Sequence, residues 1–502
     1  MSCLIALFIL LHKSVKKMTQ SISFIRNCKL HIILLLIICC CSSKNDSVIA
    51  NKNEPFISAA ISASEMLKTH MRQFDIPGMQ VAVSSGGQLV WSESFGYADL
   101  ERKIPVNNTT EFRLGSVSKS LTGAAVALLL QQGKFTLESE VYQLVPTFPK
   151  KPWPITIGQL AGHTSGIRHY NSDDEVNNTK HYETVSEALN QFSNDTLLFA
   201  PGTQVEYSSF GYTLLSAAIE SVSNSPFPEY MKNCIFVPLG MTHTSMDYTD
   251  RDIPERSKFY VLNDDDMRVE APFVDNSNKW AAGGMISTAE DLARFGNALL
   301  DNSLVRADIN DLLFKSMKTK NGVETGYGIG WQIKMDGQGR KVVLSDGSMP
   351  SARAVLLLYP AEKLVVSLLM NTGKSIFFNK EEAMMLANLF LQPTGFNPSE
   401  TERRNAVGKY SYSTTMEDEA INGVISITEE NGRLKGTMTI PNQFFKERVI
   451  PVPSVRVVGD QIDIIGVPGN WISMSFISSG NESQGIWRFG PIKGDMECRH
   501  YK

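Results

Sequence analysis

Strand patterns occur at both ends of residues 57–391, and helical patterns fill the sequence between them. Residues 57–74 have the apolar spacing of a helix, and residues 79–99 alternate like two strands joined by a Gly-Gly turn. Strand patterns return in four later segments, at 328–335, 341–347, 352–360 and 363–371. Because most of the sequence between is helical, we expect one sheet to collect strands from both ends. The sequence therefore predicts an α+β fold, an antiparallel sheet flanked by helices, with a helical insert and a cleft at their junction.

The C-terminal part of the sequence has a different pattern. Residues 393–407 have the Pro, Gly and charge mixture of a linker, and residues 408–502 contain short alternating strands separated by Asn-Gly and Gly-Asp turns. We expect a main domain at 54–392 and a separate all-β domain at 408–502, either a barrel or a sandwich. A chain of 502 residues has room for both.

The N-terminal segment 1–41 contains two apolar runs separated by basic residues. Neither run reaches the roughly 20 residues that span a bilayer. The second run ends in three consecutive cysteines at 39–41, a pattern that resembles a bacterial lipoprotein signal. We expect one of these cysteines to carry a lipid and residues 42–53 to form a polar tether, with Met18 as the start of a signal of conventional length. The alternative is an uncleaved anchor that lies in the membrane interface.

Composition limits the partners of the remaining chain. Five of the seven cysteines lie in residues 1–41, which leaves Cys234 and Cys498. Two cysteines favour a fold held by its core over a disulfide framework or a cysteine-ligated metal site. The formal net charge of −4 gives no broad basic surface for nucleic acid. Gly-Lys-Ser at 373–375 lacks the upstream glycine of a phosphate loop, and we expect no cofactor or metal.

The segment FRLGSVSKSLTG at 112–123 places Ser116 three residues before Lys119, at the start of a mostly apolar helical pattern. One interpretation is a helix N-cap followed by a solvated lysine. The other is a nucleophile with its base, because residues three apart lie on the same face of a helix. A lysine can accept a serine proton near neutral pH only if its pKa falls well below ~10.4, and burial at a helix N-terminus lowers that pKa.

A second polar segment, EYSSFGYTLL, places Tyr207 and Ser209 just before another apolar helical pattern. Ser-x-x-Lys followed about ninety residues later by Tyr-x-Ser resembles the serine β-lactamase and penicillin-binding protein superfamily. The segments GHTSG, AAGGMISTAEDLARFGNALL and GYGIGW resemble its class C β-lactamase-related branch, in that branch's order, between residues 76 and 391. Several of them are most similar to the mitochondrial β-lactamase-like serine proteins and their bacterial relatives.

The resemblance implies a role for each polar side chain. Ser116 would attack a carbonyl, Lys119 would accept its proton, and Tyr207 would relay a proton to the leaving group, with Ser209 beside it. His163, in GHTSG, is expected to brace a loop. The competing Ser-His-Asp chemistry is disfavoured because the sequence contains no Gly-x-Ser-x-Gly elbow.

A third segment departs from the pattern of this branch, which usually has Lys-Thr-Gly or His-x-Gly. The matching residues here are Ser345, Asp346, Gly347 and Ser348. Gly347 still allows close backbone approach to substrate, and the backbone N–H groups of Ser116 and Ser348 are expected to form an oxyanion hole. The cation that binds a substrate carboxylate is missing, and Arg353 is one candidate to replace it. This favours esters, amides or peptides over carboxylate-bearing β-lactams.

These residues predict a serine hydrolase that forms an acyl-enzyme on Ser116 with a small-molecule or peptide substrate. The alternative is a binding or scaffold protein that kept the fold and lost turnover, which the altered third segment also favours. We expect the protein to be lipid-anchored in the bacterial cell envelope and to face the periplasm, or to be secreted after signal cleavage.

Overall fold

The computed structural model describes the chain from residue 54 to residue 501 with several gaps. The described ranges are 54–265, 267–336, 338–373, 380–391, 398–416, 419–439, 449–452, 454–467, 472–478, 482–489 and 492–501. The predicted signal and tether at 1–53 therefore lie outside the described residues. Over these ranges, no helix is both long enough and apolar enough to cross a membrane. Cys234 and Cys498 are free thiols.

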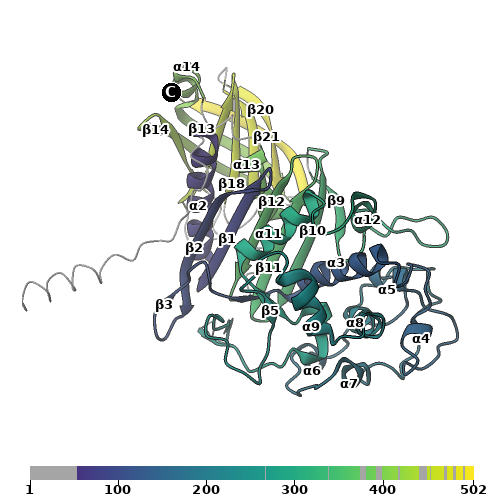
Figure 1. The fold of residues 1–502 in the computed structure, drawn as a ribbon. Helices are drawn as coiled ribbons and strands as arrows, with labels where there is room; N and C mark the ends of the chain where they lie inside the picture. The colour runs from purple at the N-terminus through teal and green to yellow at the C-terminus, as the bar shows by residue number, and fades with distance from the viewer. Residues whose placement is uncertain are drawn as a thin grey trace, which may run out of the picture. The chain divides into compact units, whose positions relative to one another are not determined.

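An antiparallel sheet of seven strands organises the first domain, in the order β3-β2-β1-β12-β11-β10-β9 (Figure 1). Its strands are β1 (Gly78–Ser85), β2 (Gln88–Asp99), β3 (Ile104–Pro105), β9 (Gln332–Met335), β10 (Lys341–Met349), β11 (Ala352–Tyr359) and β12 (Leu364–Met370). β1 pairs with β12, with Met79 opposite Met370 and Ser85 opposite Leu364. Strands from the two ends of the domain therefore meet in the middle of the sheet, and the predicted α+β fold is confirmed.

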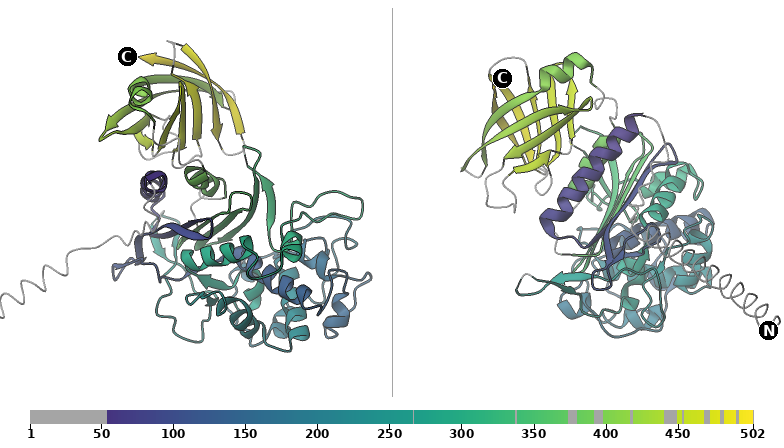
Figure 2. Two further views of the ribbon diagram at one scale, coloured as in Figure 1. Left: turned by 45° about the horizontal axis from the view of Figure 1, so that its top comes forward. Right: turned by 90° about the vertical axis from the view of Figure 1, so that its left-hand side faces the viewer.

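Helices cover both faces of this sheet (Figure 2). α2 (Glu54–Phe74) and α13 (Lys380–Leu391) pack on one face, and α11 (Ala289–Leu300) packs on the other. The side chains of β12 divide between two apolar cores: Val366 and Leu368 join the core under α2 and α13, whereas Val365 and Leu369 join the other core. Burial on both faces explains why this strand is apolar at nearly every position rather than at alternate ones.

The helical insert lies between β2 and β9 in sequence and packs around α3 (Ser118–Gln131) and α8 (Ser209–Ser223). The remaining helices of the insert are α4 (Val141–Leu144), α5 (Ile157–Ala161), α6 (Asp173–Val176), α7 (Val185–Leu189), α9 (Phe227–Met231), α10 (Trp280–Gly283) and α12 (Ala307–Leu313). Short strands cross it as β4 (Phe112–Arg113), β5 (Ser245–Met246), β6 (Tyr260–Leu262), β7 (Arg268–Glu270) and β8 (Met285–Ser287). α3 is apolar on nearly every side because neighbouring elements enclose it.

The C-terminal domain is a nine-stranded antiparallel sheet in the order β16-β15-β14-β13-β21-β20-β19-β18-β17. Its strands are β13 (Gly408–Met416), β14 (Glu419–Glu430), β15 (Arg433–Thr439), β16 (Val449–Val452), β17 (Ser454–Val458), β18 (Gln461–Val467), β19 (Ile472–Ile477), β20 (Glu482–Phe489) and β21 (Ile492–Tyr501). β15 contacts β17, and β16 contacts β18, so the two edges of the sheet approach each other as in a barrel (Figure 2). The predicted all-β domain is therefore barrel-like.

The segment expected to be a linker contains a helix, α14 (Glu400–Ala406). Ser399 and Glu402 form a capping box, in which each side chain bonds to the backbone of the other residue. This pair satisfies free N–H groups at the start of the helix and explains why so short a charged segment is helical.

Candidate active site

Ser116 lies where the helical insert meets the edge of the sheet. It belongs to a 3₁₀ turn, η1 (Gly115–Val117), that leads directly into α3. Gly115 has a φ of +50° and faces β10: a Cβ atom on it would lie 3.2 Å from the backbone N of Ser348. A Cβ atom on Gly347 would lie 1.9 Å from the carbonyl O of Leu114. Only glycine at both positions allows the nucleophile segment to approach the strand this closely.

The ammonium group of Lys119 lies beside the hydroxyl of Ser116. Its Nζ atom is 3.2 Å from Ser116 Oγ, 3.1 Å from Ser209 Oγ and 2.6 Å from the carbonyl O of Ala282. These three acceptors match the three protons of a charged lysine. When the lysine is neutral, its two N–H groups can keep their hydrogen bonds to Ser209 Oγ and the carbonyl O of Ala282, and its lone pair then faces the Ser116 hydroxyl.

Burial prepares Lys119 to act as a base. The residue is only 3% exposed, and desolvation lowers its pKa to about 7, while the negative charge of Asp346 acts in the opposite direction. Because burial disfavours the charged form of an amine, a large part of the lysine population is neutral at neutral pH. The predicted pair is therefore brought together, and Lys119 is not the solvated lysine of the N-cap interpretation.

Tyr207 bonds the same hydroxyl, and the Nζ atom of Lys119 lies 4.9 Å from the centroid of its ring. Its OH group donates a hydrogen bond of 2.7 Å to Ser116 Oγ. Burial raises the pKa of Tyr207 to about 12, although hydrogen bonds with Ser116 and Ser209 lower it. The phenol therefore keeps its proton at neutral pH and can act as a donor. The Ser209 hydroxyl accepts a hydrogen bond from Lys119 at 3.1 Å and also lowers the pKa of Tyr207, so it lies beside both groups.

Two histidines fix the loop that carries Tyr207. His163 Nδ1 accepts a hydrogen bond of 3.2 Å from the N–H of Ser208, and His169 Nδ1 accepts one of 3.2 Å from the N–H of Ser209. Burial lowers the pKa of His163 well below its usual value and lowers that of His169 to about 4, so both rings are neutral acceptors. His163 thus braces a loop, as expected. His169 was not predicted as a site residue, because its role depends on a contact with a residue 40 positions away.

The predicted oxyanion residues lie along β10 next to η1. Ser345 is buried, and its Oγ donates a hydrogen bond of 3.4 Å to the carbonyl O of Ser116. Ser348 is exposed at the far end of the strand, and a Cβ atom on Gly347 would lie 3.0 Å from the backbone N of Ser116. The amides of Ser116 and Ser348 therefore belong to two facing backbone segments, a geometry in which both can donate to one oxyanion.

Asp346 occupies the strand position between these contacts and is half-buried. Its Oδ1 atom accepts a hydrogen bond of 2.6 Å from Nε2 of Gln332, on the neighbouring strand β9. Arg353, the candidate replacement for the missing cation, donates to the carbonyl O atoms of Met349 and Ala352 at 2.9 and 3.4 Å. Its guanidinium is thus partly occupied by the backbone of its own hairpin. Gln332 was missed because no sequence pattern linked it to Asp346.

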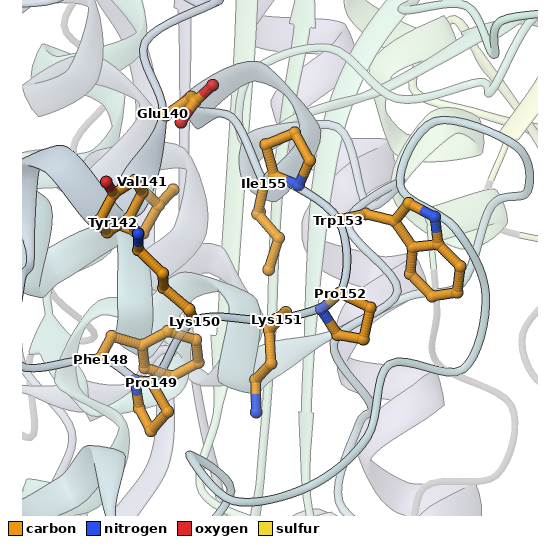
Figure 3. A pocket seen from close by; sticks show the side chains of 11 residues that line it. Glu140, Val141, Tyr142, Phe148, Pro149, Lys150, Lys151, Pro152, Trp153 and Ile155 are labelled. Carbon is orange, nitrogen blue, oxygen red and sulfur yellow. The ribbon is translucent and has the colours of Figure 1, made fainter.

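A cavity of about 270 Å³ lies elsewhere in the helical insert (Figure 3). Its walls come from the segment between Glu140 and Ile155 and include the aromatic side chains of Tyr142, Phe148 and Trp153. None of the side chains around Ser116 lines it, so this cavity is separate from the candidate active site.

A comparison with known families decides the classification. Residues 63–389 match the family model described as Beta-lactamase. The chain belongs to this family. The human protein named serine beta-lactamase-like protein LACTB, mitochondrial, is 34% identical over 313 residues, which cover 49% of this chain and 57% of the human protein. The chain thus matches little more than half the length of this relative.

Solved structures support the same fold. The octameric penicillin-binding protein homologue from Pyrococcus abyssi matches with a TM-score of 0.58 and 22% identity, over 87% of this chain and 99% of that chain. A class C beta-lactamase matches with a TM-score of 0.56 and 18% identity, over 68% of this chain and 98% of that chain. The predicted family and the beta-lactamase-like fold are confirmed, and membership of this family indicates serine hydrolase or acyltransferase chemistry.

Proposed function

We propose that this protein is a serine hydrolase that cleaves an ester, amide or peptide through an acyl-enzyme on Ser116. One observation carries the proposal: the Ser116 hydroxyl lies within hydrogen-bond distance of both a buried lysine, at 3.2 Å, and a protonated tyrosine, at 2.7 Å. A serine becomes a useful nucleophile when a base beside it can remove its proton. Burial has given Lys119 a pKa near the pH at which such a base works best.

In the first half of the reaction, neutral Lys119 accepts the proton of Ser116 while Oγ forms a bond to the substrate carbonyl carbon. The electron pair of the C=O double bond moves to oxygen, and the backbone N–H groups of Ser116 and Ser348 stabilise the negative charge. When the C=O bond re-forms, the bond to the leaving group breaks. Tyr207 donates a proton to the departing oxygen or nitrogen, and Lys119 restores it through the Ser209 hydroxyl.

In the second half, a water molecule attacks the acyl carbon. Lys119, neutral again, accepts a proton from this water as its oxygen bonds to the carbon. The Ser116–acyl bond then breaks, Oγ regains its proton, and a carboxylic acid leaves. Lys119 passes on the proton that it accepts in each half, and the proton that Ser116 loses in the first half is replaced by one from water in the second, so the site needs only water as co-substrate.

A fluorophosphonate probe tests this proposal directly. The probe reacts with activated serines, so we expect intact-mass spectrometry to show one phosphonyl adduct per chain and peptide mapping to place it on Ser116. A folded protein that gains no adduct and hydrolyses no ester in a broad panel would support the binding or scaffold alternative, which the altered third segment also favours.

We also propose that residues 1–41 direct the protein to a bacterial cell envelope, with a lipid on one of the cysteines at 39–41. The sequence pattern is what supports this proposal, because the structure does not describe residues 1–41. Grown in a bacterial host with an alkyne-tagged fatty acid, the wild-type protein and its Cys234→Ser variant should both become labelled. A variant with serine at residues 39, 40 and 41 should not, and persistent labelling of that variant would contradict the lipid anchor.

A further inference from the structure

Asp346 lies at the centre of the segment that closes the candidate active site. The residue before it, Ser345, bonds the carbonyl of Ser116, and the residue after it, Gly347, lies against Leu114 and Ser116. β10 is next to the edge strand β9, beside the start of α3 (Figure 1). A substrate whose carbonyl oxygen reaches the amides of Ser116 and Ser348 lies beside the backbone of residues 346–348, and the charge of the Asp346 carboxylate acts on Lys119 and Tyr207 at the same site.

The carboxylate of Asp346 forms no salt bridge with a described residue, although Lys119 and Arg353 lie near enough to interact with its charge. Its one hydrogen bond in the described structure comes from the neutral amide of Gln332, at 2.6 Å to Oδ1. Lys119 is near enough for the charge of Asp346 to raise its pKa, but its Nζ atom bonds Ser116, Ser209 and Ala282 instead. Since Asp346 is only half-buried, a ligand can reach it. A partly desolvated carboxylate that forms no salt bridge still attracts a cation.

Aromatic rings stand beside this carboxylate. Gln332, which bonds Asp346, pairs with Tyr327 in an isolated β-bridge, and the rings of Tyr327 and Tyr207 are 6.2 Å apart between their centroids. The charge of Asp346 also acts on both phenols. Both tyrosines are half-buried. Aromatic faces attract ammonium and quaternary ammonium groups through their π electrons, and a carboxylate next to them adds a full negative charge. This combination suits a positively charged ligand and opposes a negatively charged one.

We propose that Asp346 makes this site specific for acyl substrates that carry a positively charged nitrogen close to the scissile carbonyl. The proposal rests on the proposed hydrolase function and adds its substrate class. Asp346 would bind the ammonium, and Tyr327 would contact it through its ring face. The charge excludes substrates with a carboxylate at the same position, so the preference is opposite in sign to that of a site whose third segment supplies a cation.

Three p-nitrophenyl esters of nearly equal size test the preference: the 3-aminopropionyl ester (cationic), the butyryl ester (neutral) and the succinyl ester (anionic). We expect the wild-type protein to prefer the cationic over the neutral ester by roughly 10- to 100-fold in kcat/KM after correction for alkaline hydrolysis rates, as for a hydrogen bond to a charged group. The succinyl ester should be the poorest substrate. Butyrylthiocholine carries its positive charge on the leaving-group side, and its uncharged dimethylbutyl analogue is the matched control. A comparison of the two shows which side the cation occupies.

The variant Asp346→Asn removes the charge and keeps the shape of the side chain. Because any effect on Lys119 acts on all three esters alike, the ratio of cationic to neutral kcat/KM isolates recognition, and we expect this ratio to fall at least tenfold. Gln332→Leu removes only the neutral partner and should retain most of the preference. Equal ratios in the wild-type protein and Asp346→Asn would overturn the proposal.

Two further readouts separate this proposal from the proposed function. If Ser116 gains the phosphonyl adduct and all three esters are hydrolysed without charge preference, only the specificity fails. If no adduct and no hydrolysis occur, the hydrolase function itself fails. Should Asp346→Asn not fold, the wild-type protein alone decides, because a succinyl ester hydrolysed as fast as the aminopropionyl ester contradicts a carboxylate that selects cations.

Discussion

Replacing Ser116 with alanine is expected to lower kcat/KM for p-nitrophenyl esters by about 10³-fold or more, which is the scale of effect when a catalytic nucleophile is removed. The Ser116 hydroxyl accepts hydrogen bonds from both Lys119 and Tyr207. Without it, the base and the proton donor remain, but no acyl-enzyme can form. Stopped-flow measurement of p-nitrophenol release should show the wild-type burst of product disappear in the variant.

Ser118→Ala is the matched control for this experiment. Ser118 is a buried serine two residues further along, and its Oγ atom accepts a hydrogen bond of 3.3 Å from the backbone N–H of Met285, away from Lys119. We expect this variant to keep its burst and its phosphonyl adduct, even if it loses some stability. A Ser116→Ala protein that hydrolyses esters at the wild-type rate would refute the acyl-enzyme mechanism.

The central part of the site was predictable because local sequence carries it. Ser116 and Lys119 lie one helical turn apart, so their contact follows from helix geometry once a helix is predicted there. The contact between Tyr207 and Ser116 does not follow from helix geometry, because the two residues are 91 positions apart. Only the order of the surrounding segments indicated that they would meet. The sheet was predictable for a similar reason, because alternating strands at both ends of a domain need partners.

Other features depend on tertiary contacts that no local pattern records. The side chain of Gln332 bonds Asp346, but the backbone partner of Gln332 on the neighbouring strand is Leu344, two residues earlier. A glutamine in a strand is common on a solvated face, so the sequence did not point to this bond. His169 takes its role from the N–H of Ser209, which lies 40 residues away. The pKa of Lys119 likewise follows from the complete burial of its side chain, which a sequence can suggest but not measure. Helix α14 is a different case, since its Ser-x-x-Glu capping signal is local and can be recognised in the sequence alone.

The pH dependence of catalysis should show whether Lys119 is the base. Only the neutral amine can accept the Ser116 proton, so kcat/KM should rise with pH through the lysine pKa of about 7 and then reach a plateau. Lys119→Ala removes this limb of the profile and is expected to lower kcat/KM by about 10²- to 10⁴-fold, the usual contribution of a general base. The profile is best measured with a neutral ester such as p-nitrophenyl butyrate.

Two variants assign the rising limb of this profile to Lys119. The negative charge of Asp346 stabilises the lysine ammonium, so Asp346→Asn should move the midpoint to lower pH. Burial also raises the pKa of Glu111 to about 7, but that side chain lies beside His243, at 3.5 Å, and has no contact with Ser116. Glu111→Gln should therefore leave the midpoint where it is. If the midpoint shifts in Glu111→Gln and stays unchanged in Asp346→Asn, the rising limb reports a change in protein stability, and Lys119 is not the titrating base.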